Sequence, residues 1–189
     1  SVGLKTDEFT AKGGKKKATT TTTFLKSFDI EGLAGIPGEP GLLLGLRGPL
    51  QTKAPDKKRR AFVVHFENPD EVFQKRGAQP RLSTFATLDL KGQGISSLEY
   101  DPMTKSLLIA TTDKDERGPI ISRLWQWQLP LMDSQPVEVQ TFTGQKLEGV
   151  ARIPQGHRFE RALLLAFDEE TKGNEDKQFG RLEVFSWKP

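Results

Sequence analysis

The strongest signal for the fold is one short motif that occurs twice in the chain. Asp29-Ile30-Glu31-Gly32-Leu33-Ala34 is followed by the apolar run Leu42–Leu46, and Lys146-Leu147-Glu148-Gly149-Val150-Ala151 is followed by Leu163–Phe167. Self-similarity at a fixed offset is the sequence signature of repeat architectures. The sequence therefore predicts at least two structurally related units.

A third, weaker copy lies between them, and every copy is followed by further short apolar runs. Gly94-Ile95-Ser96-Ser97-Leu98-Glu99 precedes Leu107–Ala110. The later runs are Ala61–Phe66, Leu82–Leu90, Ser122–Trp127, Val137–Phe142 and Arg181–Trp187. Short apolar runs separated by Gly, Pro, Asp and Asn predict β-strands. We expect one helical turn, in residues 69–77 with Asn68 as its cap, in an otherwise all-β protein.

Units of four strands that recur every 40–60 residues or so are typical of β-propeller blades. We expect three such blades, at about 28–91, 92–144 and 145–189, after an irregular basic segment at 1–18. Residues 19–25 are rich in Thr and predict a β-strand, with a disordered linker as the alternative. A β-sandwich with coincidental similarity is the alternative fold.

The blade count predicts that the chain is incomplete as a ring. Closed propellers have at least about four blades, and the third unit lacks a fourth strand. We therefore expect this chain to be part of a larger propeller, completed by a partner chain or by the rest of the same gene product. Position 1 is Ser rather than Met, which is the start that processing, trimming or export would leave.

Composition excludes several classes of site. The 189 residues contain no Cys and two His, so disulfides, thiol nucleophiles and multi-histidine metal sites are absent. No apolar run is long enough for a transmembrane helix. About a quarter of the residues are Leu, Ile, Val or Phe, enough to form a core. The sequence leaves the compartment open.

Positive charge is concentrated towards the beginning of the chain. Residues 1–60 carry 12 Lys and Arg against 6 Asp and Glu, whereas residues 61–189 carry 16 against 19. Two clusters stand out, Lys15-Lys16-Lys17 and Lys57-Lys58-Arg59-Arg60. They predict either solvated loops or contact with an anionic surface. Nucleic acid is the less favoured partner, because no aromatic residues interleave with the basic ones.

The candidate site consists of carboxylates and one arginine near the strand ends that would line a propeller channel. Asp29, Glu31 and Glu148 lie at first-strand starts, and Arg47, Asp113 and Asp168 follow second strands. Oxygen ligands of this kind suit Ca²⁺ or Mg²⁺, and a metal there could activate water against a phosphoester or ester. The alternative is structural: the carboxylates bind backbone N–H groups of a neighbouring blade, and Arg47 pairs with one of them.

Other motifs indicate structure rather than chemistry. Asp113 to Gly118 begins like a calcium loop, but Arg117 and Leu124 occupy positions that need oxygen ligands. No Gly-x-Ser-x-Gly motif accompanies His65 or His157. Trp125 and Trp127 share one face of a strand, where we expect packing rather than stacking on a sugar or base.

The sequence resembles the bacterial domain-of-unknown-function 3616 family, a phytase-like or esterase-like β-propeller group. The segments that carry the resemblance are Asp29–Ala34, Leu44–Leu50, Gly94-Ile95, Leu124–Trp127 and Glu148–Ala151. It covers about residues 28–187 and corresponds to the C-terminal half of a member. Ser96-Ser97 stands where the family pattern implies Arg-Asp. The resemblance implies a propeller and no established activity.

The sequence thus favours a non-catalytic binding or assembly module that a protein partner or further blades complete. The alternative is a divalent-metal-assisted phosphoester or ester hydrolase with a carboxylate-lined channel.

Overall fold

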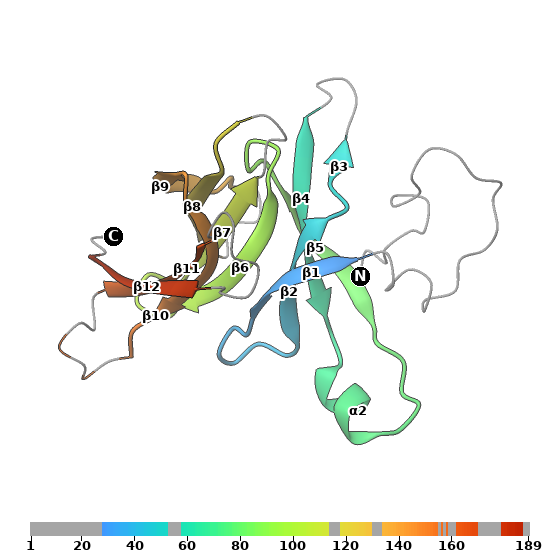
Figure 1. Ribbon diagram of the computed structural model, residues 1–189. Helices are drawn as coiled ribbons and strands as arrows, with labels where there is room; N and C mark the ends of the chain where they lie inside the picture. Colours follow the sequence, from blue (N-terminus) through green and yellow to red (C-terminus); the bar gives the residue numbers. More distant parts are fainter. Residues whose placement is uncertain are drawn as a thin grey trace. The chain divides into compact units, whose positions relative to one another are not determined.

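The computed structural model describes residues 28–52, 58–113, 118–129, 134–154, 156, 158, 162–169 and 179–186. They belong to two compact units, Ser1–Gly94 and Ile95–Pro189. Antiparallel β-sheets make up almost all of the regular structure (Figure 1). The all-β class predicted from the spacing of apolar runs is therefore confirmed. The segment 1–18 and the strand predicted at 19–25 lie outside the described residues.

The first sheet is an antiparallel meander. It begins with β1 (Asp29–Ala34), which pairs with β2 (Leu42–Gly48), then β4 (Arg59–Phe66) and β5 (Leu82–Leu88). The two-residue strand β3 (Gln51–Thr52) pairs with the beginning of β4. Strand β3 was not predicted, because both of its residues are polar and hydrophobic periodicity is the main signal for a strand.

Both faces of the central strands of this sheet are apolar. Phe62 and Val64 form a buried cluster with Leu44 and Leu46, against which Phe66 packs. Phe62, Val64 and Phe66 therefore lie on the same side of β4. The intervening residues, Leu43, Ala61 and Val63, are also buried, as unbroken apolar runs predict.

A short helix, α2 (Pro69–Gln74), connects β4 to β5 where one helical turn was expected. The predicted role of Asn68 as its side-chain cap is wrong. The Asn68 Oδ1 atom instead accepts the backbone N–H of Arg81 at 2.7 Å, and its amide donates to the Gln79 carbonyl. Asn68 therefore ties the start of the helix to the segment that returns to β5.

The second sheet is a four-stranded meander. Its strands are β6 (Gly94–Asp101), β7 (Ser106–Asp113), β8 (Ile121–Gln128) and β9 (Val137–Thr143), paired in chain order. Trp125 and Trp127 of β8 are buried. Their indole N–H groups donate to Thr111 Oγ1 and to Ser134. Both rings therefore pack in the sheet, as expected.

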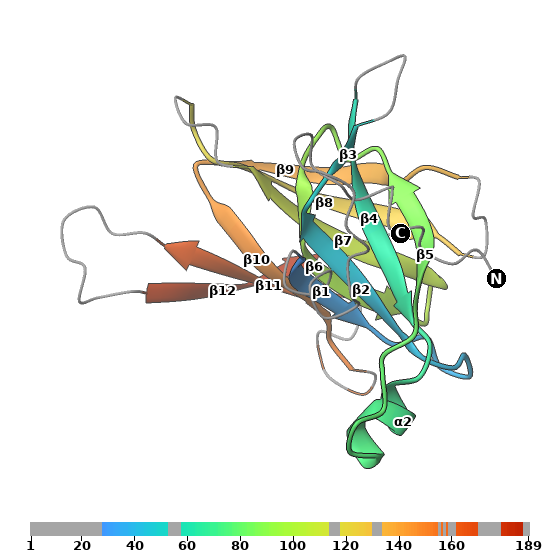
Figure 2. The same ribbon diagram turned by 90° about the vertical axis from the view of Figure 1, so that its right-hand side faces the viewer.

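The third sheet has three strands among the described residues. They are β10 (Lys146–Arg152), β11 (Ala162–Glu169) and β12 (Phe179–Ser186), again paired in chain order. The second and third sheets share a core within the second unit (Figure 2). This core consists of Leu108, Ala110, Leu124, Leu147, Val150, Leu163, Leu165 and Phe167.

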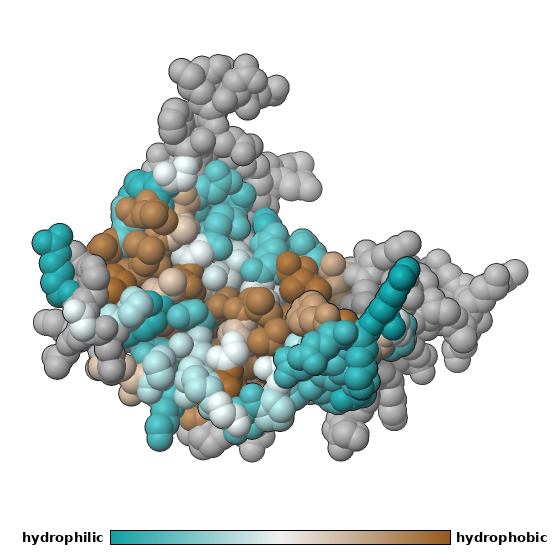
Figure 3. Space-filling view, turned by 90° about the horizontal axis from the view of Figure 1, so that it is seen from below, coloured by the Kyte–Doolittle hydropathy of each residue, from teal (hydrophilic) through white to brown (hydrophobic). Residues whose placement is uncertain are grey.

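The run Leu163-Leu164-Leu165 of β11 is apolar throughout, but its three side chains differ in burial. Leu163 and Leu165 face the core, but Leu164 is half-buried on the other face. On β12, Leu182 and Val184 have 67% and 50% of their surface exposed. Apolar side chains also reach the surface elsewhere (Figure 3). Within the described residues, no helix has the length and apolar character needed to cross a membrane.

Candidate functional site

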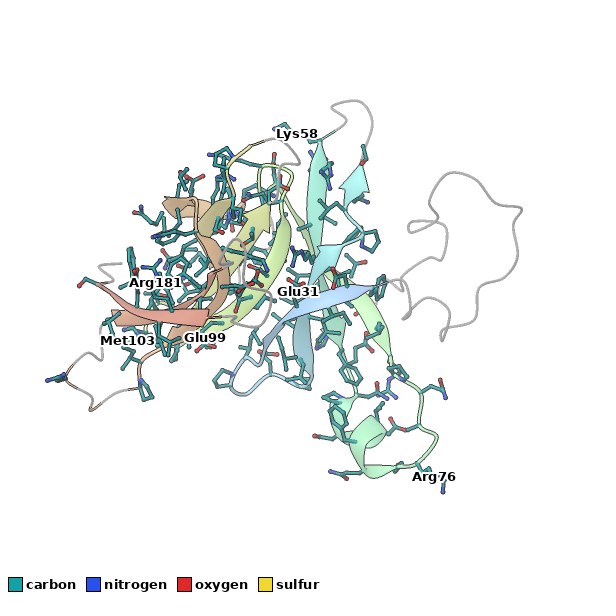
Figure 4. All side chains as sticks on the ribbon, viewed as in Figure 1. Glu31, Lys58, Arg76, Glu99, Met103 and Arg181 are labelled. Atoms are coloured by element: carbon teal, nitrogen blue, oxygen red, sulfur yellow. The ribbon has the colours of Figure 1, made fainter. Side chains whose placement is uncertain are left out.

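The first group of candidate residues forms an ion pair at the start of the first sheet. Glu31 projects from β1 (Figure 4), and Arg47 Nη1 donates to both of its carboxylate oxygens, at 2.7 and 2.9 Å. Both residues interrupt the regular pairing of β1 with β2, on either side of the pair Ile30↔Leu46. Bulges re-aim side chains in this way. They bring the glutamate and the arginine together although 16 residues separate them.

The third sheet places its candidate carboxylates at the corresponding point. Leu147 pairs with Phe167 and Gly149 with Ala166, so Glu148 occupies the same bulge in β10 that Glu31 occupies in β1. Here the partner is a lysine of the same strand. Lys146 Nζ lies 2.9 Å from Asp168 Oδ2 and 3.1 Å from Glu148 Oε1. The hydrogen bond to Asp168 raises the pKa of Lys146 above its ordinary value of 10.5, more than partial burial lowers it.

The bulge has a steric counterpart in the third sheet. A Cβ added at Gly149 would stand 3.1 Å from the Ala166 Cβ, tighter than ordinary contacts. The Glu-Gly pair of the motif thus combines a bulged glutamate with a residue small enough for close strand approach.

The other metal-ligand candidates stand apart from these pairs. Asp29 and Asp113 are exposed, the first at the start of β1 and the second at the end of β7. Among the described residues, no three His, Cys, Asp or Glu side chains come together as metal ligands would. Oxygen-rich cation sites need several converging ligands. The predicted Ca²⁺ or Mg²⁺ site therefore has no assembled ligand set in this part of the chain.

The second basic cluster lies where β4 begins. Lys58 Nζ lies 3.0 Å from Asp89 Oδ2, and this hydrogen bond holds the pKa of Asp89 below its ordinary value. Arg59 and Arg60 pair along the backbone with β3. Arg59 and Arg60 thus begin a paired strand, and Lys58 directly precedes it. Lys57 and Lys15-Lys16-Lys17 lie outside the described residues.

Sequence reasoning missed a set of hydroxyls that hold the first strand of the third sheet. Ser96 and Thr112 both donate to the Leu147 carbonyl, at 2.9 and 2.7 Å. Ser122 accepts the Leu147 N–H at 2.9 Å and donates to the Gln145 carbonyl. Ser96 and Ser122 are buried. Nothing in the sequence pointed to them, because serine and threonine are common in strands and turns.

Further along β10, a hydroxyl and a carboxylate of β6 accept two more of its backbone N–H groups. Ser97 Oγ accepts the Val150 N–H, and Glu99 Oε1 accepts the Arg152 N–H, both at 3.2 Å. Arg152 in turn lies near the fully buried Asp101, at 3.7 Å, and donates to Met103 Sδ (Figure 4). Burial raises the pKa of Glu99, against the lowering effect of the Arg152 N–H, and the nearby Asp101 raises it further. The backbone N–H contact between neighbouring sheets that was expected of the Glu-Gly carboxylates is made here by Glu99, which lies outside that motif.

Comparison with known proteins adds no identification: no family model, curated protein or solved structure matches this chain.

Proposed function

We propose that this chain is a non-catalytic assembly and binding module of the β-propeller type, related to the bacterial domain-of-unknown-function 3616 family. In this proposal its sheets are blades, and other blades or a partner chain complete the ring. The observation that carries it is the way in which the third sheet meets the second. Apolar side chains of the second and third sheets pack in one core, and hydroxyls of the second sheet accept backbone N–H groups of β10, the first strand of the third sheet.

This contact is what a stack of blades requires. A blade cannot bury both of its faces alone, so neighbours must cover them. An exposed strand edge must also be covered, because unpaired backbone groups invite aggregation. Ser97, Glu99 and Ser122 satisfy the edge N–H groups of β10. The matched bulges of β1 and β10 support descent of the first and third sheets from one repeated unit.

The ion pairs favour a structural role for the candidate carboxylates over a catalytic one. Glu31 is held by Arg47, and Glu148 and Asp168 share Lys146. A hydrolytic centre would need carboxylates free to bind a metal or move a proton. These contacts instead fasten each first strand to the second strand beside it.

The proposal is tested by the native mass and the crystal structure of the purified assembly, with every component identified by intact mass. We expect radially arranged four-stranded sheets around a central channel. Two sheets stacked as a closed sandwich would contradict the proposal.

Catalysis is tested separately with p-nitrophenyl phosphate and p-nitrophenyl acetate, in the presence of Ca²⁺ or Mg²⁺ and then of a chelator. We expect no turnover above buffer, and no difference between the wild type and the pair of substitutions Glu31→Gln and Glu148→Gln. Metal-dependent turnover that both substitutions abolish would instead establish the hydrolase.

A further inference from the structure

The last strands of the three sheets differ in how well they could pair with another strand. In the first sheet, Val63 pairs with Ala86 and Val64 with Thr84, so Phe85 is an extra residue in β5. In the second sheet, Leu124 pairs with Gln140 and Trp125 with Glu138, so Val139 is an extra residue in β9. Bulges in edge strands are a recognised protection against edge-to-edge pairing.

Within the described residues, the last strand of the third sheet shows no such bulge. β12 pairs with β11 without a break over eight consecutive residues, from Ala162↔Ser186 to Glu169↔Phe179. It contains neither Lys nor Pro, the residues that most often blunt an edge. Its outward residues Leu182 and Val184 are exposed. A long, regular and partly apolar edge is a template for another strand.

Charge selects which strand fits this edge. Arg181 and Glu183 flank Leu182 and already form an ion pair within β12. If two copies of β12 run antiparallel with Leu182 opposite Leu182, each Arg181 lies opposite the other copy's Glu183. Opposite charges directly across an antiparallel pair are stabilising. Centring the pair on Glu183 would instead place two glutamates face to face.

We propose that β12 is a self-complementary edge through which two copies of this chain associate, antiparallel and centred on Leu182. The arrangement is a two-fold symmetric contact, the commonest kind in homo-oligomers. It would add a fourth strand to the three that the third sheet has among the described residues. The inference rests on the proposed function in one respect, since it names the partner of that assembly as a second copy.

The register is tested by cross-linking, because the chain has no native cysteine. In Leu182→Cys, the two thiols would lie opposite each other across the two-fold axis. Each pair loses two electrons and two protons to an added oxidant, such as diamide, and forms one disulfide. The control is Val137→Cys, which places a thiol on the edge strand β9 at a residue of matching exposure, 69% against 67%. We expect a covalent dimer from the first variant only.

Charge reversal provides the second test, read out by sedimentation velocity of the full chain. Arg181→Glu places like charges at two symmetric points and should weaken association about tenfold. Adding Glu183→Arg to the same chain restores both the cross-copy pairs and the pair within the strand, and should restore association. Thermal unfolding of each variant separates loss of association from loss of folding.

Three results would overturn the inference. They are a monomeric wild type, equal cross-linking of the two cysteine variants, and a double variant that associates no better than Arg181→Glu. A monomeric wild type whose crystal structure still shows radially arranged sheets would leave the proposed function standing. A self-associating chain with sandwiched sheets would reject that function but retain the self-pairing.

Discussion

The strands β1 and β10 have nearly the same sequence and the same bulge, yet their surroundings differ. In β10, Leu147 is fully buried and its N–H and carbonyl are held by hydroxyls of the second sheet. In β1, the corresponding Ile30 is 42% exposed. The motif thus specifies a strand and a bulge, whereas a neighbouring sheet determines how much that strand contributes to stability.

The largest expected effect on the free energy of unfolding is the difference between alanine substitutions at the corresponding positions of β10 and β1. Leu147→Ala removes a fully buried side chain and should lower the free energy of unfolding by about 2–5 kcal/mol. Ile30→Ala removes one that is partly in water already and should cost about 1 kcal/mol or less. Urea denaturation of both variants measures the difference. Equal losses would mean that β1 is as deeply packed as β10.

Next in size is the loss of one hydroxyl that holds β10. Ser122→Ala leaves the Leu147 N–H without its acceptor in a buried position, which should cost about 1–3 kcal/mol. Ser186→Ala, at an exposed position of β12, is the matched control and should change stability little. Amide hydrogen exchange should quicken at Leu147 in Ser122→Ala. Unchanged exchange there would show that the hydroxyl does not hold the strand.

Smaller effects are expected from the ion pairs beside the bulges. Lys146→Met should cost less than about 1 kcal/mol at neutral pH, because the pairs are partly exposed. The folded-state pKa of Lys146 is raised above 10.5. Its contribution is therefore fully present below pH 10.5 and is lost as the pH rises through the folded-state value.

The corresponding variant of the first sheet removes Arg47, the partner of Glu31. Arg47→Met removes an arginine, which stays charged at these pH values. Thermal unfolding should be measured between neutral and alkaline pH. As the pH rises, the unfolding temperature of the wild type should approach that of Lys146→Met, whereas the difference in unfolding temperature between the wild type and Arg47→Met should persist. If instead the contribution of Arg47 were lost at alkaline pH and that of Lys146 persisted, the stabilising role given to the charge on Lys146 would be wrong.

The smallest effect is expected at Glu99, with the opposite sign. Its folded-state pKa lies above the ordinary 4.5, so the ionised form opposes folding and stability rises as pH falls from the folded-state value towards 4.5. Glu99→Gln retains an oxygen for the Arg152 N–H without the charge. It should stabilise the protein at neutral pH by less than about 1 kcal/mol, since solvent screens a half-buried charge.

Unfolding in urea at pH 7 and at pH 4 checks this prediction, with Glu39→Gln at an exposed position as the control. The gain should be absent at the lower pH. Destabilisation at both pH values would show that the carboxylate is required as the acceptor for β10.

Local pattern was enough to place most strands. The paired Glu-Gly motif and the leucine runs placed β1, β2, β10 and β11, because alternation and apolar runs report directly on which backbone segments are buried. Arg47 was expected to pair with a carboxylate, and it does so with Glu31. The exceptions are polar: β3 was missed, and Asn68 was assigned to the wrong partner.

The apolar pattern of the sequence predicted the all-β class and the positions of most strands, because both depend on residues close together in the chain. The bulges at Glu31 and Glu148 became visible only in the folded chain, because a bulge is a feature of register between two strands. The same holds for the contacts by which Ser96, Thr112, Ser122 and Glu99 hold β10, because their partners lie 25 to 53 residues away. The folded chain also showed that the edge strands β5 and β9 each contain a bulge, whereas β12 pairs with β11 without one. Strand register depends on pairing across a sheet, and no property of a single strand reveals it.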